Sequence, residues 1–173
     1  PPTMPAADGG AARAPAPRVA VILPARDEET TIAPCIADFH AALPGARIVV
    51  VDNGSRDRTV ERARAAIAAI GGAGRLLTET RPGKGAAGRR AFRAIDADVY
   101  LLVDADSTYP ADRARDLVAP ILAGAAEMVV GDRRADGAYA RGASTWRATR
   151  PSAGSWRGSS VARSGTCSAA TGR

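Results

Sequence analysis

The stretch "YLLVDADSTYP" (Tyr100–Pro110) joins a short apolar run to two carboxylates that lie one residue apart. The apolar run predicts a buried strand, so Asp104 and Asp106 stand where that strand leaves the core. Side chains alternate along an extended chain, which puts both carboxylates on the same side. Two like charges in this position cost free energy unless a cation lies between them. The spacing therefore favours a site for Mg²⁺ or Mn²⁺, whose preferred ligands are oxygen atoms.

The alternative for the same stretch is a pair of solvated carboxylates at the start of a helix that begins with Pro110. The D-x-D spacing alone does not decide between a metal site and a helix start. The decision depends on what lies around it in the chain.

Between residues 18 and about 134, short β-branched runs alternate with amphipathic stretches, the pattern of βαβ units in a mostly parallel sheet. The expected strands are apolar throughout, which is typical of a sheet covered on both faces. We expect strands at 18–24, 46–52, 75–80, 98–104 and 127–133, and helices over 32–43, 60–70, 83–95 (entered from a loop) and 110–123.

Polar residues cluster where the expected strands end. The clusters are "PARDEE" after the first strand, "DNGS" after the second, "DADST" after the fourth and "GDRR" after the fifth. Ligands of open α/β sheets bind at the carboxyl ends of the strands. We therefore expect the chemistry of the protein at one rim of the sheet.

Three further candidates belong to this rim, and each has a purely structural alternative. Asp52 can accept hydrogen bonds from a base or a ribose, or it can form the turn of "DNGS". Lys84 is the only lysine and lies among glycines at a helix start, where it can approach phosphate or belong to a flexible turn. Glu28 stands before a helix whose positive end favours acids, so capping is its alternative role.

Composition limits the class of protein. The net charge is +6, but residues 1–140 hold 18 basic and 18 acidic residues, whereas 141–173 hold six arginines and no acid. A basic face for nucleic acid is therefore not indicated.

Cys35 and Cys167 are far apart in sequence and lack neighbouring histidines, which argues against a disulfide framework or a zinc site and favours a reduced, cytoplasmic setting. Residues 1–17 are rich in Pro, Ala and Gly and are expected to be a disordered leader.

Five segments in order resemble the nucleotide-sugar-binding part of family 2 glycosyltransferases of the GT-A fold, in the branch similar to dolichol-phosphate mannose synthases. They are "VAVILPARDEETTI", "IVVVDNGSRDRT", "RPGKGAAGRRAF", "YLLVDADSTYP" and "MVVGDRR". The resemblance covers about residues 18–140. It implies an α/β, GT-A (Rossmann-like) sheet flanked by helices and incomplete at the C-terminus.

The resemblance also implies the chemistry of the rim. Asp104 and Asp106 would be the catalytic, metal-binding pair for Mg²⁺ or Mn²⁺. The sugar nucleotide would be bound by Pro24, Ala25, Arg26, Glu28, Val50, Asp52, Lys84, Ala105, Thr108 and Arg133. The implied reaction is transfer of the sugar with inversion, from a nucleoside diphosphate to an acceptor that is a polyprenyl phosphate or a saccharide. A cytoplasmic protein at the inner face of the membrane, bound peripherally, fits such an acceptor. No segment of the sequence is apolar enough for a membrane span.

Beyond about residue 141 the family pattern fails. Residues 141–173 are rich in Ser, Gly, Ala and Arg and are expected to be an irregular basic tail. With GC-leaning codons, "GTCSAATG" back-translates to bases that read "DLLSGYR" when regrouped by one base, so we hypothesise a one-base frame shift near residues 141–144. The alternative is a basic tail that docks on anionic lipid. A frame-shifted chain is expected to be weakly active or inactive as a transferase. The alternative functions are a non-catalytic nucleotide-binding module and a sugar-phosphate nucleotidyltransferase.

Overall fold

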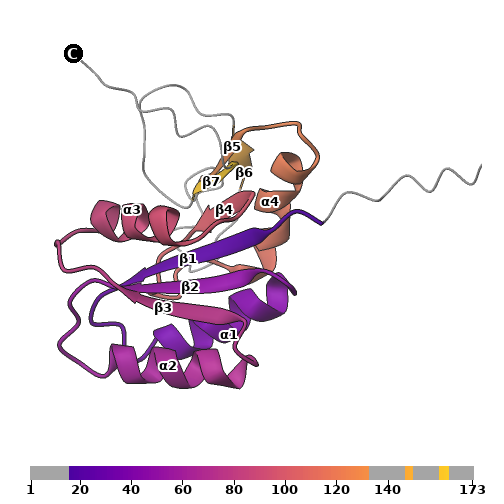
Figure 1. The fold of residues 1–173 in the computed structure, drawn as a ribbon. Helices are drawn as coiled ribbons and strands as arrows, with labels where there is room; N and C mark the ends of the chain where they lie inside the picture. The colour runs from indigo at the N-terminus through magenta and orange to yellow at the C-terminus, as the bar shows by residue number, and fades with distance from the viewer. Residues whose placement is uncertain (1–15, 133–146, 150–159, 164–173) are drawn as a thin grey trace, which may run out of the picture.

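The computed structural model describes residues 16–132, 147–149 and 160–163, and within these ranges a seven-stranded sheet forms the centre of the protein (Figure 1). The strand order is β3-β2-β1-β4-β7-β5-β6. Four neighbouring strands are parallel: β3 (Gly74–Thr78), β2 (Arg47–Asp52), β1 (Val19–Ala25) and β4 (Val99–Leu102). The expected mostly parallel α/β sheet is confirmed.

The other three strands extend the sheet beyond β4 in antiparallel pairs. β7 (Ser160–Arg163) lies between β4 and β5 (Met128–Asp132), and β6 (Arg147–Thr149) pairs with the outer side of β5. Two short strands therefore come from the segment 141–173, for which the sequence predicts no regular structure. Apolar periodicity is weak in that segment, so only pairing with the sheet defines these strands. The domain boundary near residue 140 stays a prediction.

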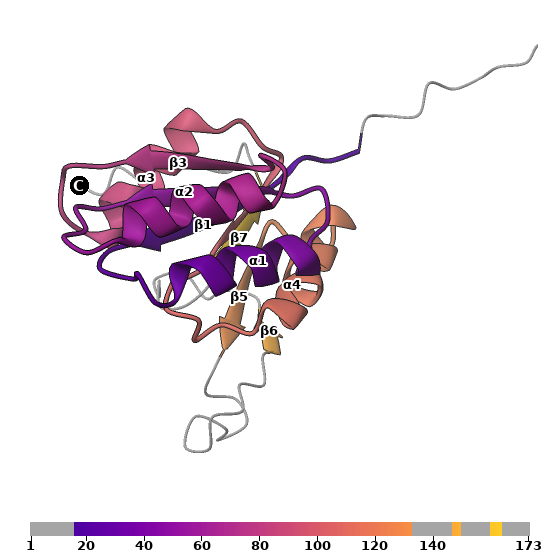
Figure 2. The same cartoon turned by 90° about the horizontal axis from the view of Figure 1, so that it is seen from below.

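Helices cover both faces of the sheet. On one face lie α1 (Ile32–Ala42), α2 (Thr59–Ala69) and α4 (Ala114–Leu122), whose apolar side chains share one core with the sheet (Figure 2). On the opposite face lies α3 (Lys84–Ala94), which packs its alanines against Ile22, Val49 and Val51. Burial on both faces explains why the strands are apolar throughout.

The observed elements agree with the expected ones except at some ends. The fourth strand ends at Leu102, so the chain leaves the sheet before Asp104. The fourth helix begins with a 3₁₀ turn, η1 (Ala111–Arg113), after Pro110. Arg58 precedes α2 without a side-chain cap, and the Asp57 carboxylate accepts a hydrogen bond from the backbone N–H of Thr59, the first residue of the helix, at 2.9 Å.

The strand order places the site. The chain builds β1, β2 and β3 in one direction across the sheet and then crosses back, over the face covered by α3, to add β4 on the other side of β1. At such a switch point the loops that follow the two central strands diverge and leave a crevice. The loops after β1 and β4 are those that carry Glu28 and the aspartate pair.

Some expectations lie outside the described residues. They are the disordered leader through residue 15, the contact predicted for Arg133, and most of the basic tail. Within the described ranges, no helix combines the length and the apolar character that crossing a membrane requires.

Candidate functional site at the switch point

The loops that follow β1 and β4 meet at the switch point. The Ser107 hydroxyl donates a long hydrogen bond to the carbonyl of Thr31 at 3.5 Å, and the Cys35 thiol lies 3.9 Å from the carbonyl oxygen of Asp104. These contacts join the start of α1 to the turn that carries the aspartate pair. The polar clusters that follow the first and fourth strands, "PARDEE" and "DADST", are therefore neighbours at the rim.

Asp104 has a protein partner on each of its two carboxylate oxygens. The Tyr109 hydroxyl donates to Oδ2 at 3.0 Å, and the Lys84 ammonium forms an ion pair with Oδ1. Lys84 is the first residue of α3, the helix on the face of the sheet opposite α1, α2 and α4. The sequence marked Asp104 and Lys84 separately, and the structure brings them into contact.

Asp106 is held by its own turn. Its Oδ1 accepts hydrogen bonds from the backbone N–H of Thr108 at 3.0 Å and from the Thr108 hydroxyl at 2.6 Å. Ser107, between them, has a φ of 58°, in the left-handed region that tight turns use. Oδ2 of Asp106 takes part in neither of these bonds.

Asp104 and Asp106 lie on the same side of the chain, the arrangement that a shared divalent cation would need. Val103 and Ala105 are buried whereas Asp104 and Asp106 are half-buried, so the expected alternation holds after the strand has ended. Within the described residues, no group of three or more His, Cys, Asp or Glu side chains is arranged to hold a metal. Mg²⁺ commonly binds one or two carboxylates and completes its shell with water and substrate phosphate oxygens. A two-carboxylate site is the kind that needs the substrate to complete it.

The loop after β1 is tied to the loop after β2 by hydrogen bonds between backbone N–H groups and side chains. The Glu28 N–H donates to the Thr59 hydroxyl at 2.7 Å, and the other bonds are Asp27 N to Ser55 Oγ, Arg56 N to Asp27 Oδ1, Glu29 N to Asp57 Oδ2 and Arg58 N to Glu29 Oε2. The Glu28 carboxylate accepts from the Thr31 hydroxyl at 2.7 Å. The "DEET" and "DNGSRDRT" segments thus hold each other in place. The sequence of either segment alone does not predict these hydrogen bonds.

Asp52 forms the turn that was one of the two roles expected for it, and its role in nucleotide binding stays a prediction. It is the last residue of β2 and is buried, and its carboxylate accepts hydrogen bonds from the backbone N–H groups of Gly54 at 3.3 Å and Ser55 at 3.2 Å. This is the turn that "DNGS" predicts. A carboxylate has about four acceptor sites, so two remain in principle for a ligand hydroxyl or base N–H.

Asn53 is a residue of the site that the sequence analysis did not single out. Its buried amide donates to the carbonyls of Glu79 at 2.8 Å and Arg81 at 2.7 Å, and its oxygen accepts from the N–H of Gly83 at 2.7 Å. Gly83 has a φ of 109°, which side chains other than hydrogen rarely tolerate. Asn53 therefore fixes the backbone immediately before Lys84. An asparagine in "DNGS" also fits an ordinary turn, so no sequence signal distinguishes this role.

Cys35 lies beneath the rim. Burial, and then the negative charges of Asp38, Asp106 and Glu28, raise the pKa of its thiol to about 12. The thiol is neutral at physiological pH and adds no charge to the rim.

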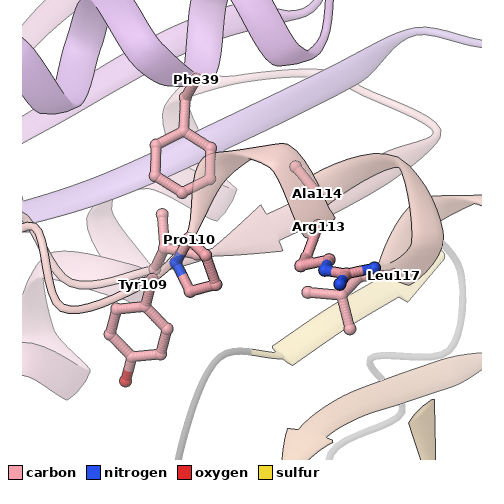
Figure 3. Close-up of a pocket in the computed structure, with 7 residues that line it drawn as sticks. Phe39, Tyr109, Pro110, Arg113, Ala114 and Leu117 are labelled. Carbon is pink, nitrogen blue, oxygen red and sulfur yellow. The ribbon is translucent and has the colours of Figure 1, made fainter. Parts of the chain in front are cut away.

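A small apolar hollow lies between α1 and the start of α4 (Figure 3). It is lined by Phe39, Val103, Tyr109, Pro110, Arg113, Ala114 and Leu117. Its free volume of about 10 Å³ is at the lower limit for one water molecule, so it is a packing gap and not a nucleotide site. In Figure 3 the Tyr109 hydroxyl is directed away from the hollow, and this is the group that binds Asp104.

The structure places most, but not all, of the expected nucleotide-binding residues near the rim. Pro24 and Ala25 end β1 beside Asp52, and Arg26 is exposed with its Nε 3.9 Å from Asp27 Oδ2. Thr108 is exposed beside Asp106, whereas the side chain of Ala105 is buried beneath the pair. Val50 lies fully buried in the middle of β2, away from the rim, and Arg133 lies outside the described residues.

Comparison with known proteins agrees with this geometry. The sequence model of glycosyl transferase family 2 matches residues 20–167, most of the chain. The chain belongs to glycosyl transferase family 2. One relative in this family is protein RfbJ of Shigella flexneri, which is 39% identical over 119 residues, covering 69% of this chain and 88% of RfbJ.

Longer members of family 2 share only part of their length with this chain. Glucosyl-3-phosphoglycerate synthase of Mycolicibacterium paratuberculosis is 38% identical over 96 residues, which are 53% of this chain and 29% of the synthase. The structure of the Mycobacterium tuberculosis synthase in complex with Mn²⁺, UDP-glucose and glycerol 3-phosphate superposes with a TM-score of 0.55 at 28% identity, covering 65% of this chain and 43% of that one. The GT-A fold is confirmed, and the chain spans less than half the length of these synthases.

Proposed function

We propose that this chain is the donor-binding part of a glycosyltransferase that uses a nucleoside-diphosphate sugar and a divalent cation. The observation that carries the proposal is the ion pair between Lys84 and Asp104, two residues before Asp106, at the switch point of the sheet. Two carboxylates and one ammonium at this place suit a cation and a diphosphate together. The structurally similar synthase in complex with Mn²⁺ and UDP-glucose supports the same class of ligand.

The donor would lie along the rim from β2 to β4. Asp52, at the end of β2, has acceptor capacity for the nucleoside, and Glu28 lies between it and the aspartate pair. At the other end Lys84 stands at the N-terminus of α3, where backbone N–H groups and the helix dipole favour phosphate. This order puts the diphosphate beside Asp104 and Asp106.

Asp104 and Asp106 would hold Mg²⁺ or Mn²⁺, which as a Lewis acid offsets the negative charge of the leaving diphosphate. The Tyr109 hydroxyl orients Asp104 through Oδ2, and the Thr108 hydroxyl and N–H orient Asp106 through Oδ1. We propose displacement at the anomeric carbon with inversion, since a single displacement needs no protein nucleophile. The rim carboxylates then serve to orient the donor and not to attack it.

Two acceptor classes follow from the family resemblance. A polyprenyl phosphate presents an oxygen that is already anionic and needs no general base, whereas a saccharide hydroxyl needs one. His40, the only histidine, lies on α1, is half-buried, and its Nδ1 has no hydrogen-bond partner among the described residues. We propose the phosphate acceptor, because its oxygen is deprotonated without a protein base. Peripheral binding at the cytoplasmic face of the membrane is part of the same proposal.

Nucleotide binding by the full chain tests the metal role. Asp104→Asn and Asp106→Asn keep the side-chain size and remove the charge, and we expect each to weaken Mn²⁺-dependent binding of a nucleoside-diphosphate sugar by at least about tenfold, or about 1.4 kcal/mol. Titration calorimetry with UDP-glucose and GDP-mannose, with and without MnCl₂, measures this. Asp116→Asn, an exposed change of the same kind on α4, is the control. Variants that bind as tightly as the wild type would remove the metal role.

A second function is a nucleotide-binding module without catalysis. Release of nucleoside diphosphate from the donor in the presence of Mn²⁺, with or without a polyprenyl phosphate, separates the two functions. Binding without any release supports the module.

A further inference from the structure

The ion pair between Lys84 and Asp104 joins two groups that the proposed reaction uses for different purposes. Asp104 is a proposed metal ligand and Lys84 a proposed phosphate contact, yet here each has the other as its partner. The Lys84 side chain is 46% exposed and that of Asp104 29%. The pair therefore lies at the mouth of the site and not in the core.

The backbone that carries Lys84 is fixed. Asn53 binds the segment before α3 through the carbonyls of Glu79 and Arg81 and the N–H of Gly83. A lysine on such a fixed backbone still has a flexible four-carbon stem and three ammonium donors that reorient together. An exchange of partners by Lys84 therefore requires only a rotation of its side chain.

The two partners of Asp104 differ in how readily they can leave. Tyr109 is only 6% exposed and is packed beside the hollow between α1 and α4. Lys84 is half-exposed and is attached to the loop side of the rim. A divalent cation that binds Asp104 needs an oxygen of this carboxylate, and a second positive charge next to it is unfavourable. Lys84 is therefore the partner that the cation displaces.

We propose that Lys84 is an exchangeable counter-ion: it neutralises Asp104 when no metal is bound and moves to the diphosphate of the donor when a divalent cation takes its place. The inference rests on the proposed function and adds an order to it. Without nucleotide, Lys84 and the cation compete for Asp104. With nucleotide, the ammonium has an anion to bind, so the cation and the diphosphate each favour the binding of the other.

The exchange predicts effects of opposite sign for one substitution. In Lys84→Met, Mn²⁺ alone should bind roughly threefold to tenfold more tightly, because a half-exposed ion pair and a like charge no longer oppose it. In the same variant, UDP or GDP in the presence of saturating Mn²⁺ should bind about tenfold more weakly, because a charge-assisted hydrogen bond to phosphate is lost. A residue that only supports the fold would weaken both.

The experiment uses the full chain and two readouts that do not depend on turnover. Electron paramagnetic resonance of free Mn²⁺ gives the affinity for the metal alone, and calorimetry gives the affinity for UDP and for GDP at saturating Mn²⁺. Arg93→Met, which removes one positive charge from the last turn of the same helix, is the matched control and should change neither value by more than about twofold. Lys84→Gln provides a second variant, and circular dichroism verifies that each is folded.

The outcomes separate the inference from the proposed function. Tighter Mn²⁺ binding together with weaker nucleotide binding in both Lys84 variants supports the exchange. If the wild type binds Mn²⁺ with nucleotide but the Lys84 variants bind Mn²⁺ alone no more tightly than the wild type, the exchange is wrong and the proposed function stands. If the wild type binds neither UDP nor GDP with Mn²⁺, both are wrong.

Discussion

At the scale of single residues, the site depends on how Asp104 is oriented. Tyr109 holds Oδ2, so Oδ1 is the oxygen directed to Lys84. A buried phenol that donates to a carboxylate forms a charge-assisted hydrogen bond, which is stronger than a neutral one. The position of this carboxylate is therefore decided by a residue that the D-x-D pattern does not include.

We expect Tyr109→Phe to weaken Mn²⁺-dependent nucleotide binding by about threefold to tenfold, because Asp104 loses its orienting hydrogen bond. Tyr100→Phe is the control, since the Tyr100 hydroxyl lies on the opposite side of the sheet from α1, where it donates to the carbonyl of Ile95 at 2.8 Å and accepts from the N–H of Ala97 at 3.2 Å. Both variants should lose about 1 kcal/mol of stability. Calorimetry checks binding and urea unfolding checks stability. Equal losses of binding in both variants would contradict an orienting role.

At the scale of elements, the segment between β3 and α3 decides where the phosphate end of the site lies. The Arg81 side chain and its backbone N–H donate hydrogen bonds to the Glu79 carboxylate, at 3.2 Å and 2.8 Å. The Asn53 amide donates to the backbone carbonyls of Glu79 and Arg81. Backbone hydrogen bonds reach this segment at its two ends, where the Glu79 N–H donates to the carbonyl of Asp52 and the Gly83 carbonyl accepts from the N–H groups of Ala86 and Ala87. Its conformation therefore rests on a few side chains.

We expect Asn53→Ala to lower the free energy of unfolding by about 3 kcal/mol, because three hydrogen bonds are lost and two carbonyls and an N–H are left without that partner. Ser55→Ala, in the same loop, loses one bond from the N–H of Asp27 and should cost about 1 kcal/mol or less. Urea unfolding monitored by circular dichroism measures both. A loss in Asn53→Ala no larger than in Ser55→Ala would show that the segment is fixed by other contacts.

The same segment gives a pH dependence. The hydrogen bonds from the side chain and then the backbone of Arg81 lower the pKa of Glu79 from its ordinary value of 4.5. A carboxyl whose pKa is lower in the folded state stabilises the fold above its unfolded pKa, and this stabilisation is lost as the pH falls. We therefore expect the wild type to be more stable than Glu79→Gln at pH 7, with the difference in Tm disappearing between about pH 5 and pH 3. A difference that stays constant down to pH 3 would contradict this cause.

At the scale of the whole molecule, β7 joins β5 to the parallel part of the sheet. It pairs with β4 on one side and β5 on the other, although it comes from the segment after residue 141. From the sequence we expect the domain to end near residue 140, and the residues that follow to be the product of a frame shift near residues 141–144 or a basic tail. The match to the family model extends to residue 167.

A chain that ends at residue 140 distinguishes these views. Without β6 and β7, β5 loses both of its neighbours in the sheet and β4 becomes an edge. We expect a lower Tm and association into larger species, because unpaired edges pair with other chains. Thermal unfolding and size-exclusion chromatography check this against the full chain. An unchanged Tm in a monomeric truncated chain would place the boundary at residue 140, and the other reading frame of the gene then tests the frame shift.

The sequence by itself determined the succession of the parallel strands and helices along the chain and the polar clusters that follow the strands. Apolar runs such as "IVVVD" and "YLLVD" are local patterns, and a carboxylate directly after such a run stands at a strand end whatever the rest of the fold does. The two candidate acids Asp104 and Asp106 were identifiable for this reason, and so was the family.

Only the tertiary structure decided which of these residues are partners. The contacts of Lys84 and Tyr109 with Asp104, of Asn53 with the segment before α3, and of β7 with β4 each join parts of the chain whose relative position depends on packing. A hydrogen bond or ion pair needs its two atoms within about 3 to 4 Å. No local pattern encodes that proximity, because the crossing of α3 over the sheet and the reversal of strand order set it.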